Sequence, residues 1–185
     1  GSIRDGLIHI NRSLISFYTD SYLGLSNGLS NPTVLCLYQD KTSDMIWIGT
    51  DGEGVNKFDP HTSKFEHYSS TFKKKVVSIA EYSESKLAIS VYGDGIYMFD
   101  KNTGNIQPMH IADTTMQYQI RFSGRSINLL NEADGDILMY SNAIYRYDKS
   151  TGKCTRIISE DPESSHSNFQ TIGHSEEGVW LHDNF

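Results

Sequence analysis

A repeated segment that ends in an aromatic residue followed by aspartate constrains the fold of this chain more than any other feature. The copies of this ending are Phe58-Asp59, Phe99-Asp100 and Tyr147-Asp148. The first two follow a glycine-rich turn whose second glycine is Gly54 or Gly95, a spacing of 41 residues, and the third copy comes 48 residues later with one turn residue deleted. A period of this length indicates a repeat architecture in which each copy is one structural unit.

Short apolar runs alternate with turn signals inside each unit. In the first unit the runs cover 34–38, 45–50, 55–59 and 65–68. These lengths and the residues between them are typical of strands, and no segment carries a persuasive helical period. The aspartate that ends each third run opens a turn in which its side chain hydrogen-bonds to the backbone. The runs 34–38 and 45–48 are apolar on both faces, so each sheet must be covered on both sides.

Four short antiparallel strands in every 41 to 48 residues, with each sheet covered by the next, define the blade of a β-propeller. We therefore predict an all-β chain in which 1–185 is a propeller fragment of about four blades, made of three complete units and two complementary half units. The predicted blades span 29–70, 75–110 and 124–159, and the half units span 3–22 and 167–185.

The two half units carry complementary parts of the repeat, and each would leave an open sheet edge by itself. We expect strands within 168–182 to pair with strands within 7–18 and complete a fourth blade. This pairing would close a ring of four blades within one chain, or join two chains that share blades around a larger ring.

Composition excludes several kinds of partner. The net charge of −7 and the single basic run at Lys73-Lys74-Lys75 would repel a phosphate backbone, so we expect no nucleic acid partner. No apolar stretch approaches the roughly 18 residues of a membrane span, so we expect no direct membrane insertion of this segment. The two cysteines, Cys36 and Cys154, lack the spacing of a metal or redox site.

The first unit resembles the two-component regulator propeller repeat, which occurs in tandem in the sensor regions of hybrid two-component systems of polysaccharide-degrading bacteria. The residues that agree in order are Asn31, Val34, Asp40, Ile46-Trp47-Ile48-Gly49-Thr50, Gly52, Gly54, Val55 and Phe58-Asp59. The second unit departs from the family pattern at Ala88 and Ser90, and the third lacks the glycine turn.

This resemblance implies a non-catalytic sensor segment of a protein whose histidine kinase activity lies in other modules. It implies a periplasmic location in an inner-membrane protein. It also implies an oligosaccharide as ligand, and other propeller blades or a second chain of the same protein as partners.

Loops on one propeller face would then bind the ligand. Trp47, Tyr92 and Tyr140 fall near the second strands or their exits, where aromatic rings can stack on sugars, although core packing is the more common role of a tryptophan such as Trp47. Asp51, Glu53 and Asp94 lie in the glycine turns. These are the predicted ligand-binding residues: Trp47, Asp51, Glu53, Tyr92, Asp94 and Tyr140.

Two other classes of function compete with the sensor. Propellers also host lyases and glycosidases, and Glu53 with Asp51 or Asp94 could act as acid and base across a sugar. The chain could instead be a scaffold that binds only protein partners. No nucleophile elbow occurs, and the loop 49–54 does not have the spacing of a dinucleotide-binding loop, so we predict no catalytic residues, no metal and no cofactor.

Overall fold

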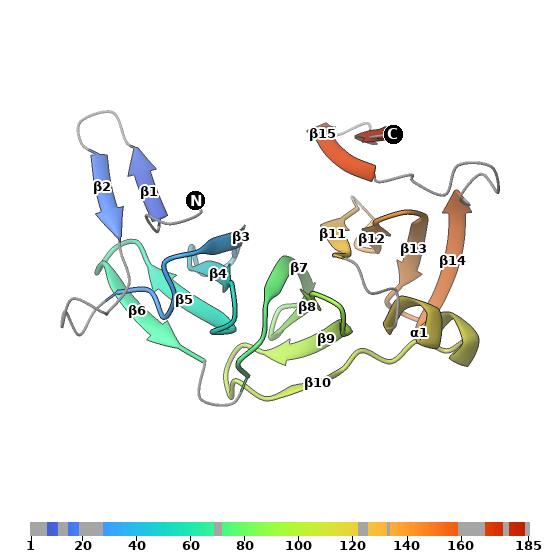
Figure 1. Ribbon diagram of the computed structural model, residues 1–185, viewed down its shortest axis with the longest axis horizontal. Helices are drawn as coiled ribbons and strands as arrows, with labels where there is room; N and C mark the ends of the chain where they lie inside the picture. The colour runs from blue at the N-terminus through green and yellow to red at the C-terminus, as the bar shows by residue number, and fades with distance from the viewer. Residues whose placement is uncertain are drawn as a thin grey trace.

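The computed structural model describes residues 7–10, 15–18, 28–68, 72–121, 126–132, 134–158, 169–175 and 178–183. Within these residues the chain is built of β-strands and one short helix (Figure 1). The all-β prediction is therefore confirmed. The predicted half units at 3–22 and 167–185 lie partly outside the described residues.

The core of the molecule is a row of three four-stranded antiparallel sheets, each with its strands in sequence order. Blade 1 contains β3 (Val34–Gln39), β4 (Ile46–Thr50), β5 (Val55–Asp59) and β6 (Lys64–His67). Blade 2 contains β7 (Val76–Ser83), β8 (Lys86–Val91), β9 (Gly95–Asp100) and β10 (Ile106–Pro108). Blade 3 contains β11 (Asn128–Asn131), β12 (Ile137–Tyr140), β13 (Ile144–Asp148) and β14 (Lys153–Ile158).

The three blades follow one another in an arc, with β3, β7 and β11 on its concave side (Figure 1). These first strands contact each other across the blade boundaries. The Ser78 hydroxyl in β7 accepts a hydrogen bond from the backbone N–H of Leu129 in β11 at 2.9 Å, and Asn131 donates to the carbonyl of Glu81 at 2.6 Å. Side chains therefore join strands that no backbone ladder connects.

Apolar layers fill the spaces between blades and explain why the strands are apolar on both faces. Trp47 of blade 1 packs with Leu87 and Phe99 of blade 2. Ala88 and Met98 of blade 2 pack with residues of blade 3 in a second layer. The sheet of blade 2 thus buries both of its faces, as the uninterrupted apolar pattern predicts.

The turns between third and fourth strands have the predicted chemistry. The carboxylates of Asp59, Asp100 and Asp148 each accept a hydrogen bond from the backbone N–H two residues later, at 2.8 to 3.0 Å. The residue after the aspartate is lysine in blades 2 and 3, and it reaches back to the preceding blade: Lys101 binds Asp40 at 2.6 Å, and Lys149 donates to the carbonyl of Tyr82 at 3.1 Å. These turns therefore also hold neighbouring blades together.

The half units do not pair with each other as expected. β1 (Leu7–Ile10) pairs with β2 (Ile15–Tyr18), and β15 (Phe169–Ser175) pairs with β16 (Gly178–Asp183). They are two separate two-stranded sheets, drawn at opposite ends of the arc in Figure 1. The described strands therefore do not form a closed ring of four blades, because the two hairpins lie at different ends of the arc and each pairs only with itself.

A helix that the sequence pattern did not predict, α1 (Thr114–Arg121), lies in the linker between blades 2 and 3. Asp113 caps it by accepting a hydrogen bond from the backbone N–H of Met116 at 2.9 Å. This helix belongs to the additional residues that lengthen the spacing from 41 to 48. The described part of the chain contains no helix with the length and apolarity needed to cross a bilayer.

Candidate ligand-binding face

Antiparallel strands in sequence order place alternate turns at opposite edges of each blade. The turns between second and third strands therefore share one edge with the linkers that join consecutive blades. Backbone hydrogen bonds confirm this arrangement, because Gly54 N–H donates to the carbonyl of Lys74 at 3.1 Å and Tyr92 N–H donates to that of Lys75 at 3.0 Å. We call this edge the linker face; its described parts are the turns 51–54, 92–94 and 141–143, the linker 72–75 and the end of the second linker at 117–121. Residues 110–112 of that second linker instead contact the turn 148–152, where the Ala112 N–H donates to the carbonyl of Gly152 at 2.9 Å.

Glycines allow the turns to approach the linkers closely. Gly54 has a φ of +70°, and a Cβ atom there would lie 2.2 Å from the carbonyl oxygen of Phe72. Gly95 has a φ of +99°, and a Cβ there would lie 2.9 Å from Cα of Arg121 in α1. Only glycine adopts the left-handed backbone without strain and also has no Cβ to clash with so close a neighbour. This explains why glycines occupy these turns.

A charged cluster of three acid–base pairs joins blades 1 and 2 on the linker face. Lys75 lies 2.7 Å from Asp51, Lys73 lies 3.7 Å from Glu53, and Lys74 forms an ion pair with Asp94. Asp94 also accepts a hydrogen bond from the Tyr97 hydroxyl at 2.7 Å. Each acidic side chain of the glycine turns is thus already neutralised by the linker lysine run.

Electrostatics keeps Asp94 in its charged form. Burial raises the pKa of this carboxyl, but the hydrogen bonds from Lys74 and Tyr97 outweigh burial and lower the pKa below its ordinary value. The same contact, together with burial, raises the pKa of Tyr97 to about 12. A general acid near neutral pH needs the opposite shift, so Asp94 is better suited to hold the linker than to donate a proton.

The predicted ligand-binding residues fall into two groups. The turn residues Asp51, Glu53, Tyr92 and Asp94 all lie around the lysine run, and the Tyr92 side chain is 53% exposed. Trp47 is only 2% exposed and packs edge to face on Phe99, with ring centroids 5.4 Å apart.

Tyr140 is also buried and belongs to a cluster with Leu138 and Ile144. The structure therefore places the Trp47 and Tyr140 side chains inside the protein, away from the four turn residues.

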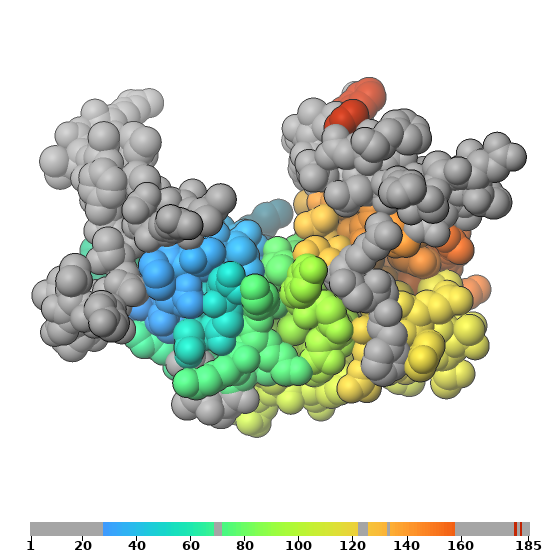
Figure 2. Space-filling model, in the orientation of Figure 1, coloured from blue at the N-terminus to red at the C-terminus, as the bar shows by residue number. Residues whose placement is uncertain are grey.

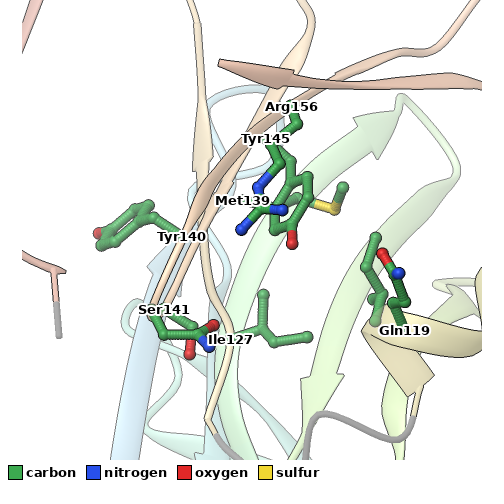
Figure 3. Close-up of a pocket in the computed structure, with 9 residues that line it drawn as sticks. Gln119, Ile127, Met139, Tyr140, Ser141, Tyr145 and Arg156 are labelled. Atoms are coloured by element: carbon green, nitrogen blue, oxygen red, sulfur yellow. The ribbon is translucent and has the colours of Figure 1, made fainter. Parts of the chain in front are cut away.

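A cavity of about 260 Å³ opens between α1 and blade 3. Figure 2 shows the yellow α1 segment against the orange strands of blade 3. Three apolar side chains, Ile120, Ile127 and Met139, line the cavity together with the polar residues Gln119, Ser141, Asn142, Tyr145 and Arg156; Tyr140 also contributes to it. In Figure 3 the Tyr140 ring points away from Tyr145 and Arg156.

Sequence reasoning did not identify this cavity. Gln119 lies on the unpredicted helix, while Tyr145 and Arg156 lie on the two strands of one hairpin and are direct neighbours because β13 pairs with β14 in that register. The guanidinium of Arg156 lies 5.8 Å from the centroid of the Tyr145 ring, a cation–π distance. No local motif marks such a pair, although the Asp113 cap signal could have revealed the helix.

No protein-family model and no curated protein sequence matches this chain. Solved structures do match it. The extracellular domain of BT4673 from B. thetaiotaomicron, a proposed hybrid two-component system, has a TM-score of 0.69 at 23% identity and covers 98% of this chain and 24% of its own. The extracellular domain of a second proposed hybrid system from this organism, BT3049, has a TM-score of 0.69 at 18% identity and covers 98% and 25%.

An ancestral GH74 enzyme is also similar, with a TM-score of 0.64 at 15% identity, covering 98% of this chain and 25% of its own. This chain therefore spans about a quarter of the length of these solved structures. At these identities the similarity shows the fold, which is that of β-propeller blades. The propeller-blade fold predicted from the repeat units is thus confirmed, and two of the similar structures are extracellular domains of proposed hybrid two-component systems.

Proposed function

We propose that this chain is a non-catalytic ligand-input segment of a two-component signalling protein and that its ligand is an oligosaccharide bound at the linker face. The observation that carries the proposal is the cavity between α1 and blade 3, because it lies where a linker meets a turn and combines apolar walls with polar groups. Small-molecule sites have this composition. The fold of the two-component neighbours supports the signalling role.

The geometry suggests how binding would be transmitted. α1 belongs to the linker between blades 2 and 3, and Gln119 and Ile120 of α1 face Met139 and Tyr145 of blade 3 across the cavity. A ligand that contacts both α1 and blade 3 binds most tightly to one relative position of the helix and the blade. Binding then shifts the balance of conformations by the difference in affinity.

We place this segment in the periplasm, as part of an inner-membrane protein whose histidine kinase lies in other modules. The matching neighbours are extracellular domains, which supports this location. We further propose that other blades, of the same protein or of a second chain, are its protein partners. Leu35 and Leu37 of β3, which are 39% and 45% exposed, offer apolar area for such a contact.

The second candidate is a carbohydrate-active enzyme, and the similarity to the GH74 enzyme favours it. Its acid–base pair would come from Asp51, Glu53 and Asp94. Each of these carboxylates is paired with a lysine of the linker, and Asp94 has a lowered pKa, which favours a holding role over proton transfer. We therefore rank the sensor first.

A thermal-shift screen with product analysis tests the proposal. The chain is heated with a panel of neutral and acidic oligosaccharides, and each sugar is afterwards recovered and analysed by mass spectrometry. A ligand that binds only the native state raises the midpoint temperature of unfolding. At a ligand concentration a hundredfold above Kd, the free energy of unfolding increases by about 2.7 kcal/mol. Stabilisation with intact sugar is the expected result.

Two results would contradict the proposal in different ways. Cleavage of the sugar would show that the chain is a carbohydrate-active enzyme. Failure of every carbohydrate to stabilise the chain would favour the protein-binding scaffold instead.

A further inference from the structure

We infer that the cavity between α1 and blade 3 recognises the carboxylate of an acidic sugar, a hexuronate unit, through Arg156. This inference rests on the proposed oligosaccharide sensor and specifies which kind of sugar its linker face selects. The residues that carry it are Arg156 and Tyr145 on the blade, and Gln119 on the helix.

The strand pattern fixes the direction of Arg156. Alternate residues of a strand face the same side, and Cys154, two residues earlier in β14, is buried in the layer between blades 2 and 3. Arg156 therefore projects from the same side as Cys154, beyond the edge of that apolar layer. Figure 3 shows its side chain beside the Tyr145 ring, with Gln119 on the opposite side of the cavity.

Arg156 is an exposed side chain whose charge has no acidic partner among the residues that the structure describes. Arg146, on the neighbouring strand, shows the usual arrangement: its guanidinium donates to both carboxylate oxygens of Glu132 at 2.7 Å. Among the described residues Arg156 has no ion pair, and none of the residues that line the cavity is acidic. A guanidinium that faces a cavity without a counter-charge favours an anionic ligand.

The chemistry of the walls selects a sugar carboxylate among anions. The planar guanidinium matches a carboxylate with two parallel hydrogen bonds. Ile120, Ile127 and Met139 give an apolar surface for the C–H face of a sugar ring, while Gln119 and Ser141 place polar groups near its hydroxyls. The volume of about 260 Å³ is slightly below the range of about 300–1,000 Å³ for small-molecule pockets, so the cavity accommodates one ring.

Isothermal titration calorimetry tests this inference with galacturonate, galactose and galactose 6-sulfate as matched probes. We expect galacturonate to bind at least about tenfold more tightly than galactose, because only galacturonate offers the guanidinium a carboxylate for charge-assisted hydrogen bonds. Arg156→Gln should remove this preference, and Arg156→Lys should restore part of it. Lys153→Gln removes an exposed charge from the same strand, outside the cavity, and should leave the preference unchanged.

The outcomes separate the inference from the proposed function. Equal affinities of the unchanged chain for galacturonate and galactose overturn the inference, and no variant is needed for this comparison. Galacturonate binding that survives Arg156→Gln also overturns the inference. So does tighter binding of galactose 6-sulfate than of galacturonate, or binding of acetate as tight as that of galacturonate. In these cases oligosaccharide binding elsewhere on the linker face would leave the proposed function standing, whereas failure of every sugar, neutral or acidic, would overturn both.

Discussion

Lys101, at the turn after β9, extends to Asp40 at the end of β3, and its ammonium nitrogen lies 2.6 Å from the carboxylate. The two side chains are 8% and 3% exposed, so this ion pair is almost fully buried at the boundary between blades 1 and 2. Burial raises the pKa of Asp40, but hydrogen bonds from Lys101 and Thr42 outweigh it and hold the pKa well below its ordinary value. The pair fixes the position of one blade on the next.

Lys101→Met should destabilise the chain strongly, because it leaves the Asp40 carboxylate buried without a charged partner, bonded only by Thr42. Breaking one side of a buried pair costs about 3–5 kcal/mol. The matched control is Lys57→Met, whose partner Glu66 is 61% exposed, and it should cost less than about 1 kcal/mol. Urea denaturation measures both, and similar losses in the two variants would show that Lys101 does not hold the blades together.

The stability of the chain should fall in acid partly because of Asp40. A carboxyl whose pKa is lowered in the folded state contributes stability above its unfolded pKa of about 3.9, and this contribution is lost as the pH falls toward the folded value. Asp40→Asn removes this titration, so its stability should decline less steeply than that of the original chain between about pH 5 and 2. Thermal unfolding across this range measures the two slopes; parallel curves would contradict the assignment.

Gly54→Ala should be more damaging than Gly52→Ala. Both positions have positive φ, +70° and +102°, but only at Gly54 would the new Cβ meet a backbone oxygen, that of Phe72 at 2.2 Å. Strain alone costs about 1–3 kcal/mol, and the clash at Gly54 adds to it. Chemical denaturation of the two variants compares them, and an equal loss would mean that the turn does not approach the linker as closely as described.

Trp47→Phe should lower stability without changing sugar affinity. The indole is 2% exposed and its Nε1 has no hydrogen-bond partner in the part of the chain that the structure describes, so the side chain acts through packing against Phe99. Replacing it with a smaller ring leaves a void that costs about 1–3 kcal/mol. Denaturation and calorimetric titration together check this prediction. A loss of sugar affinity at unchanged stability would return Trp47 to the binding residues.

The repeat could be predicted from the sequence because its signals are local. An apolar run such as Ile46–Thr50 and an aspartate turn such as that at Asp59 each determine their own segment, and three sheets followed from them. The helix could not be predicted from periodicity, because α1 is 8 residues long and buries only Ile120. Its stability comes from a cap and from packing rather than from a repeating apolar face.

The site depended on contacts between distant parts of the sequence. Asp51 and Asp94 could be placed on one face because each follows a recognisable strand. The hairpin turn at Asp148 also brings Tyr145 opposite Arg156, but the helix that completes the cavity was not predicted. The expected pairing of the half units within one chain was wrong for a related reason: strand propensity identifies a strand but not its partner. Pairing between two chains stays a prediction.

Amide hydrogen exchange with and without a stabilising oligosaccharide tests the central claim most directly. Binding at the linker face should slow exchange in α1 and in residues 140–145, and leave the opposite-edge turns 59–63 and 100–104 of blades 1 and 2 unchanged. Slowed exchange confined to those opposite turns, with α1 unaffected, would show that the sugar binds elsewhere and would contradict the account.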